Sequence, residues 1–181
     1  SWIDYVATSD TDVSAFTRPF TLAGTALPFH NYGVREQEVF TQEVRLASQF
    51  DGKLQFIAGL YYEDRELDRV QTWSWSGDVA LDPFMGVPLF FIPDTETTEQ
   101  LALFGEISYQ LTDQLTATLG ARNFDYDRDT ALGFNGPVAP AIESSESGTT
   151  YKANLSYQPN DDLLVYGQWA EGFRLGYPLL S

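Results

Sequence analysis

The amino-acid sequence predicts an all-β fold, an antiparallel up-and-down meander of about seven strands. Two observations lead to this prediction. Apolar and polar residues alternate with period two in segments of about ten residues, and helical periodicity is hardly present. Short turns and long connections also follow one another in strict alternation. That order is typical of outer-membrane barrels, which have short turns at one rim and long loops at the other.

The first predicted hairpin keeps one apolar and one polar face. Even-numbered positions carry most of its large apolar side chains, and odd-numbered positions carry Glu43 and Arg45. Gly52 is free to take the positive φ that a three-residue loop requires. The first strand of the chain and the two strands of this hairpin are expected at residues 1–9, 37–49 and 54–62. Because paired residues share a face, the expected pairs are Val44 with Ala58 and Leu46 with Phe56.

The second hairpin repeats this scheme with odd-numbered apolar positions, and its opposite face carries Glu106 and Arg122. Its strands are expected at residues 99–111 and 115–122, with Ile107 paired to Leu119.

The third hairpin is expected at residues 151–158 and 163–169, with Leu155 paired to Val165 across a turn at Pro159-Asn160-Asp161. Residues 108–115 return as residues 156–163 with five of eight positions identical, which indicates one structural unit used twice.

Three long connections are expected, at residues 10–35, 67–95 and 129–147. Structureless loops of about 20 residues are uncommon in compact soluble domains, whereas extracellular loops of outer-membrane barrels are long. The alternation of faces alone fits both a lipid-facing barrel wall and a soluble β-sandwich. Tyr109 and Tyr157, just before short turns, favour the barrel, because interfacial rings lie at headgroup level there.

Composition excludes several classes of function. The chain of 181 residues has a net charge of -16, so a basic surface for nucleic acid is not expected. It contains no cysteine, which excludes disulfides and thiolate metal sites. No apolar run reaches the roughly 18 residues of a membrane-spanning helix.

Enzyme and metal motifs are not found. His30, the single histidine, has no Ser or carboxylate pattern that would make it a base. The acidic run at residues 125–129 departs from a calcium loop at its sixth and twelfth positions. The paired charges Glu63 and Arg65 read better as mutually neutralising than as acid and base. We therefore expect no enzymatic activity, no metal and no cofactor.

Three segments resemble the barrel of TonB-dependent outer-membrane receptors. They are the hairpin Phe40-Thr41-Gln42-Glu43-Val44-Arg45-Leu46-Ala47-Ser48 through Tyr62, the strand Phe104-Gly105-Glu106-Ile107-Ser108-Tyr109, and the strand ending in Gly172-Phe173-Arg174. The resemblance implies a plugged 22-stranded barrel in the outer membrane of a Gram-negative bacterium. Such a receptor imports a scarce nutrient, such as a ferric siderophore, cobalamin or an oligosaccharide, with energy from the TonB complex.

The resemblance also sets the expected domain organisation. A complete barrel would need on the order of 600 residues, so residues 1–181 are expected to be a partial barrel domain, a sector of a transmembrane β-barrel. The plug domain, through which the TonB complex acts, is missing from this sequence. The expected partners are outer-membrane lipid, the TonB complex and a small molecule that the sequence does not identify. The alternatives are a small non-transport outer-membrane barrel and a soluble carbohydrate-binding β-sandwich.

The family's layout gives the candidate site residues. Glu43, Arg45, Glu106 and Arg122 are expected to face the lumen. The loop aromatics Trp73 and Trp75 are candidates for ligand contact, because indole rings stack on sugars and on aromatic siderophores.

Overall fold

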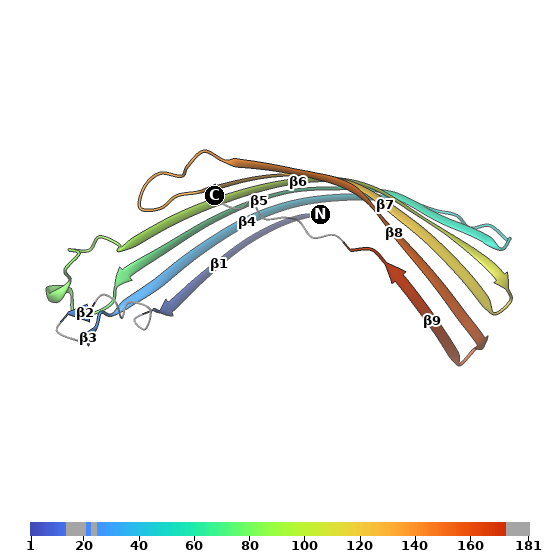
Figure 1. Cartoon of the computed structure of the whole chain (residues 1–181), viewed down its shortest axis with the longest axis horizontal. Coiled ribbons are helices and arrows are strands. Elements are labelled where there is room, and N and C mark those ends of the chain that lie inside the picture. The colour runs from blue at the N-terminus through green and yellow to red at the C-terminus, as the bar shows by residue number, and fades with distance from the viewer. Residues whose placement is uncertain (14–20, 23–24, 173–181) are drawn as a thin grey trace. The chain divides into compact units, whose positions relative to one another are not determined.

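The structure is a computed structural model and describes residues 1–13, 21–22 and 25–172. A seven-stranded sheet dominates it, with the order β1-β4-β5-β6-β7-β8-β9. Figure 1 shows these strands side by side in chain order. The sheet strands are β1 (Trp2–Asp12), β4 (Phe29–Ala47), β5 (Leu54–Trp75), β6 (Phe90–Thr112), β7 (Leu115–Leu132), β8 (Ile142–Asn160) and β9 (Leu163–Ala170). The predicted all-β antiparallel meander of about seven strands is confirmed.

The smaller elements lie between these strands. β2 (Thr21–Leu22) pairs with β3 (Thr25–Ala26), and η1 (Val79–Leu81) is one turn of 3₁₀ helix. No helix in the described part of the chain is long and apolar enough to span a membrane.

The chain divides into two compact units, which are described separately. Unit 1 comprises Ser1–Phe40, Arg65–Thr98 and Arg128–Glu143, and unit 2 comprises Thr41–Asp64, Glu99–Asp127 and Ser144–Ser181. Unit 1 contains the long connections between sheet strands, at residues 13–28, 76–89 and 133–141. Unit 2 contains the short turns, at residues 48–53, 113–114 and 161–162. The predicted alternation of short and long connections is confirmed.

The predicted bounds of the long connections are wrong, because the strands continue well into them. β5 runs to Trp75 and β6 begins at Phe90, so much of the expected connection at residues 67–95 is strand. From residue 64 the even-numbered positions of β5 carry Asp64, Glu66 and Asp68 instead of apolar residues. The hydropathy alternation therefore ends there, while the strand continues.

Register is as predicted in one hairpin and shifted in two. Ser108 Oγ lies 2.8 Å from Thr118 Oγ1, as the predicted pairing of Ile107 with Leu119 requires. In the third hairpin Leu155 pairs with Gly167 and not with Val165, because the ladder shifts register between Tyr157 and Asn160.

The first hairpin is shifted by the same amount. Ser48 N donates to Phe56 O (2.9 Å) and Phe56 N donates to Ser48 Oγ (2.8 Å), so Phe56 lies opposite Ser48 and not Leu46. Both shifts are by two residues, so every side chain keeps the face predicted for it.

Hydrogen bonds within the connections of unit 1 fix their course. Asp82 accepts hydrogen bonds from Phe84 N (2.8 Å) and Gly86 N (2.7 Å), and Gly86 has a positive φ of 82°. Asn135, itself at φ 51°, accepts a hydrogen bond from Phe91 N (2.7 Å). The last connection is thereby joined to the start of β6.

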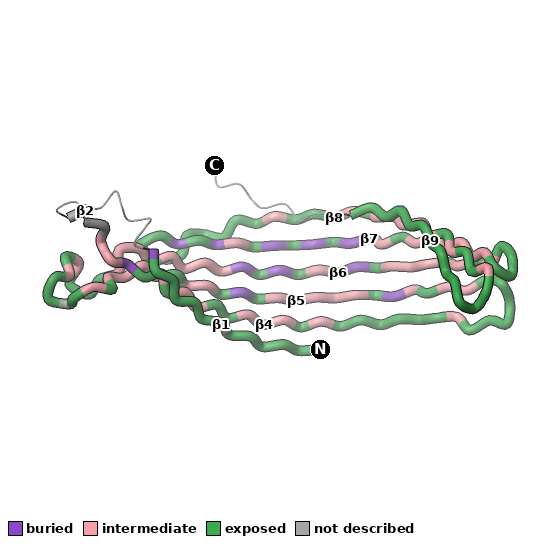
Figure 2. Tube along the Cα trace, turned by 90° about the horizontal axis from the view of Figure 1, so that it is seen from below, coloured by how far each residue is buried: buried purple, intermediate pink, exposed green. Residues whose placement is uncertain are grey.

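Burial in unit 2 is concentrated on one face of the sheet. Ala102, Phe124 and Tyr126 form a buried cluster with Tyr61 packed against it. Buried positions of the sheet lie mainly on β5, β6 and β7 (Figure 2). The opposite face of unit 2 presents large apolar side chains that are 57% to 66% exposed, namely Val44, Leu103, Ile107 and Leu119. A soluble sandwich would cover such a face, whereas a membrane barrel leaves it to lipid.

Candidate functional site

The four charged residues predicted for the lumen lie together in unit 2. Glu43, Arg45, Glu106 and Arg122 line one open hollow of about 350 Å³, and Lys152 lines it with them. β4, β6, β7 and β8 each supply at least one of these residues at alternate positions on the same side of the sheet.

The charges in this hollow largely neutralise one another. Arg45 forms an ion pair with Glu43, and Lys152 Nζ lies 2.6 Å from Glu106 Oε1. The guanidinium of Arg45 also lies 5.7 Å from the ring centre of Phe104. These contacts are half-exposed ion pairs, which stabilise a protein by about 1 kcal/mol at most.

Arg122 is held differently. Its guanidinium lies 5.3 Å from the ring centre of Tyr61, while its Nε is buried and has no hydrogen-bond partner in the described part of the chain.

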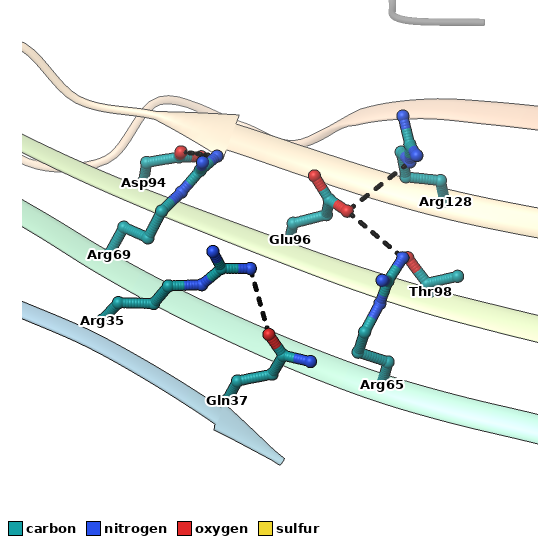
Figure 3. Close-up of polar contacts among 8 residues, drawn as sticks. All are labelled: Arg35, Gln37, Arg65, Arg69, Asp94, Glu96, Thr98 and Arg128. Carbon is teal, nitrogen blue, oxygen red and sulfur yellow. Dashed lines mark hydrogen bonds and ion pairs between the residues drawn. The ribbon is translucent and has the colours of Figure 1, made fainter. Parts of the chain in front are cut away.

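A second set of charges lies in unit 1 on β5, β6 and β7. Glu96 Oε1 lies 3.7 Å from Arg65 Nη2 and 3.7 Å from Arg128 Nε, so one carboxylate stands between two guanidinium groups (Figure 3). Glu96 and Arg128 are 6% and 5% exposed. Arg65 also donates to Thr98 Oγ1 at 3.4 Å. Buried charges are tolerated when they are paired in this way.

Two further arginines lie on the same side of unit 1. Arg69 forms an ion pair with Asp94, and Arg35 Nη2 donates to Gln37 Oε1 at 3.0 Å (Figure 3). The set drawn in Figure 3 thus has four arginines and two carboxylates, so its net charge is 4 − 2 = +2. This local excess of positive charge lies in a chain whose net charge is -16. We call these six charged residues the arginine cluster.

Only one member of the arginine cluster, Arg65, is named on sequence grounds, as a neutralising partner of Glu63, and in the structure it forms an ion pair with Glu96. The other members of the cluster lie in segments that the sequence predicts as connections, or just outside the predicted strands. The signal that identifies them is parity, because Arg65 and Arg69 continue the odd-numbered face of β5 beyond Tyr61.

Trp73 and Trp75 lie at the end of β5, so their predicted position in a loop is wrong. Trp73 packs edge-on against Phe90 at 5.4 Å, and its Nε1 is buried without a hydrogen-bond partner in the described part of the chain. Trp75 Nε1 donates to Asp78 O at 3.0 Å, and its ring meets that of Phe29 at 6.0 Å. Both rings therefore help to pack this end of unit 1.

No metal-binding group stands out in unit 1 or unit 2. The residues that the structure describes contain no set of three or more His, Asp or Glu side chains arranged to hold a metal ion. His30 Nδ1 lies 3.0 Å from Asp10 Oδ1. The acidic run at residues 125–129 lies within β7.

One family model shows the family to which the chain belongs. The family model described as "TonB dependent receptor-like, beta-barrel" matches residues 2–181. No curated protein matches the chain. Among solved structures, the chain is similar to the ferric yersiniabactin uptake receptor FyuA from Yersinia pestis, with a TM-score of 0.58 and 18% identity. The similarity covers 92% of this chain and 25% of the other, so the chain spans about a quarter of that receptor's length.

Proposed function

The chain belongs to the TonB-dependent receptor β-barrel family, and from this we propose that it is part of an outer-membrane receptor that imports a scarce nutrient. TonB-dependent receptors are transporters of the Gram-negative outer membrane and not enzymes. The match to FyuA supports the fold of the barrel wall and leaves the nutrient open.

We assign residues 1–181 to a sector of the barrel. In this assignment the exposed apolar face of unit 2 meets lipid, and the face with Glu43, Arg45, Glu106 and Arg122 lines the lumen. By analogy with outer-membrane barrels, we assign the long connections to the extracellular rim and the short turns to the periplasmic rim. The TonB complex would act through a plug domain encoded outside this sequence.

A ferric siderophore is the nutrient that we favour over cobalamin or an oligosaccharide. The observation that carries this choice is the arginine cluster, with a net charge of +2. Many ferric siderophores are anions, and a positive wall in an otherwise acidic protein raises their local concentration. Trp73, whose Nε1 has no partner in the described part of the chain, is the retained candidate for contact with such a ligand. Trp75 is the weaker candidate, because its Nε1 already bonds to Asp78 O.

Uptake by cells tests this proposal. Cells that contain or lack the full-length receptor would be grown under iron limitation and given radiolabelled iron on catecholate, hydroxamate or carboxylate siderophores. We expect uptake of one class that requires both the receptor and TonB. Uptake of cobalamin or an oligosaccharide alone would refute the siderophore assignment. Absence of any receptor-dependent uptake would refute the transport role.

A further inference from the structure

One hollow in unit 1 is lined by Arg35 and Arg69, two members of the arginine cluster. It has a volume of about 310 Å³ and lies where β1, β4 and β5 run side by side. Its lining includes the polar residues Thr8, Ser9, Arg35, Arg69 and Gln71, together with Gly33. Ser9 is paired with Gly33 in the ladder between β1 and β4, so the two residues share a face.

The glycine provides the space in this hollow. A Cβ atom at position 33 would lie 2.6 Å from Ser9 Oγ, closer than real Cβ atoms approach another atom. The Ser9 hydroxyl therefore lies over the bare backbone of Gly33. A side chain at residue 33 would force this hydroxyl to move.

The arginines of the hollow are not fully neutralised. Arg69 pairs with Asp94 through Nη2, but its Nε is buried and has no partner among the described residues. Arg35 donates to the neutral amide of Gln37 and makes no ion pair with a carboxylate in the described part of the chain. Arg35, Arg69 and the Asp94 carboxylate that pairs with Arg69 together carry a net charge of +1 at the hollow.

We propose that this hollow binds an oxyanion, a carboxylate or phosphate group, of the imported solute. The inference rests on the proposed function, because it assigns the hollow to that solute. Guanidinium groups match the geometry of such oxyanions, and the Ser9 hydroxyl and the Gln71 amide add neutral hydrogen-bond donors. Arg35 bonds to a neutral amide, so its positive charge is the one that a bound oxyanion would neutralise.

Calorimetric titration of the purified full-length receptor with citrate and with inorganic phosphate tests the inference. We expect at least one probe to bind, more weakly at high salt. Arg35→Gln and Arg69→Gln should each weaken binding about tenfold or more, since each removes a charged hydrogen-bond donor. Gly33→Ala should also weaken it by crowding Ser9 Oγ. The matched control is Lys53→Gln, which removes the same charge beside the exposed short turn of unit 2.

The outcomes separate this inference from the transport role. Loss of binding in the hollow variants with Lys53→Gln unchanged supports it, even if no ferric complex is imported. If neither probe binds, or if Lys53→Gln weakens binding as much as Arg69→Gln, the inference is wrong. That result would leave the proposed transport function standing, because uptake by cells tests it separately.

Two further results would also overturn the inference. One is receptor-dependent uptake of the imported nutrient that is unchanged in Arg35→Gln and Arg69→Gln. The other is a loss of thermal stability in these two variants when the wild type binds neither probe. That result would mean that the arginines of the hollow pair with an acidic side chain of the receptor and not with a solute. Arg35→Gln keeps the test valid if Arg69→Gln fails to fold, since Arg35 bonds only to a neutral amide.

Discussion

At the scale of single residues, the charged hollow of unit 2 and the arginine cluster of unit 1 differ in burial. Substitutions in the two sites should therefore change the stability of the protein by different amounts. The pair of Arg45 and Glu43 has side chains 65% and 32% exposed, so water screens it. Glu96 and Arg128 have side chains only 8% and 5% exposed. Removing one member of a buried set leaves the other charges without compensation.

Glu96→Ala is therefore predicted to destabilise the receptor. It would leave Arg65 and Arg128 without their shared carboxylate, at a cost on the order of 3 kcal/mol. Urea unfolding in detergent, followed by tryptophan fluorescence, would measure the loss. The matched control is Glu43→Ala, for which we expect a change below about 1 kcal/mol. Equal losses from the two substitutions would contradict the difference in burial.

At the scale of strands, aromatic rings lie across glycines of the neighbouring strand. The ring of Phe104 occupies the space where a Cβ of Gly59 would stand, and Phe124 Cζ would lie 3.1 Å from a Cβ of Gly148. Because each ring lies over a glycine of the neighbouring strand, Phe124 is buried even though the same face of the sheet has an open hollow.

Gly59→Ala is accordingly predicted to cost about 1–3 kcal/mol, since the added methyl group forces the Phe104 ring out of its position. Gly167→Ala is the control, because no atom lies within 4 Å of a Cβ built there. Thermal unfolding of both variants in the same detergent checks the difference. A neutral Gly59→Ala would mean that Phe104 does not pack on this glycine.

Strand extent gives a second prediction at this scale. The amides of residues 66–75 and 90–95, apart from Pro93, which has none, should exchange slowly with deuterium, because they belong to β5 and β6. Those of residues 82–88, in the connection, should exchange faster. Hydrogen–deuterium exchange read by mass spectrometry would test this. Fast exchange throughout residues 66–95 would contradict the extended strands and would support the long loop that the hydropathy pattern predicts.

At the scale of the whole molecule, the apolar face of unit 2 and the acidic even-numbered positions of β5 in unit 1 indicate different surroundings. Leu103 is 62% exposed, as a side chain that contacts lipid would be. Glu66 is exposed in the part of β5 where apolar residues have ended. Under the proposed function, the first position lies in the hydrocarbon region and the second lies beyond it.

Leu103→Arg should therefore destabilise the receptor in lipid vesicles by about 2–4 kcal/mol, whereas Glu66→Arg should change stability by about 1 kcal/mol or less. Both substitutions introduce an arginine, so the difference reports depth in the membrane. Reversible unfolding from vesicles measures it. Similar effects at the two positions would contradict the lipid-facing assignment.

Much of the fold follows from the sequence because lipid and lumen impose a pattern that is local. Each position of a strand faces one side or the other, so the period of two identifies the hairpins and the shared face of Glu43, Arg45, Glu106 and Arg122 without knowledge of distant contacts. The hollow that these residues line is visible only in the structure. The resemblance to TonB-dependent receptors, confirmed by the family model, rests on the same segments.

The tertiary structure alone decided where the strands end, which residues pair and which charges meet. Backbone pairing continues wherever a neighbouring strand is present, so β5 and β6 extend past the point where hydropathy alternation stops. The register shift between Tyr157 and Asn160 leaves no mark on the alternation, because a shift of two residues preserves the faces. Arg65, Glu96 and Arg128 are far apart in sequence, and only the alignment of three adjacent strands brings them together.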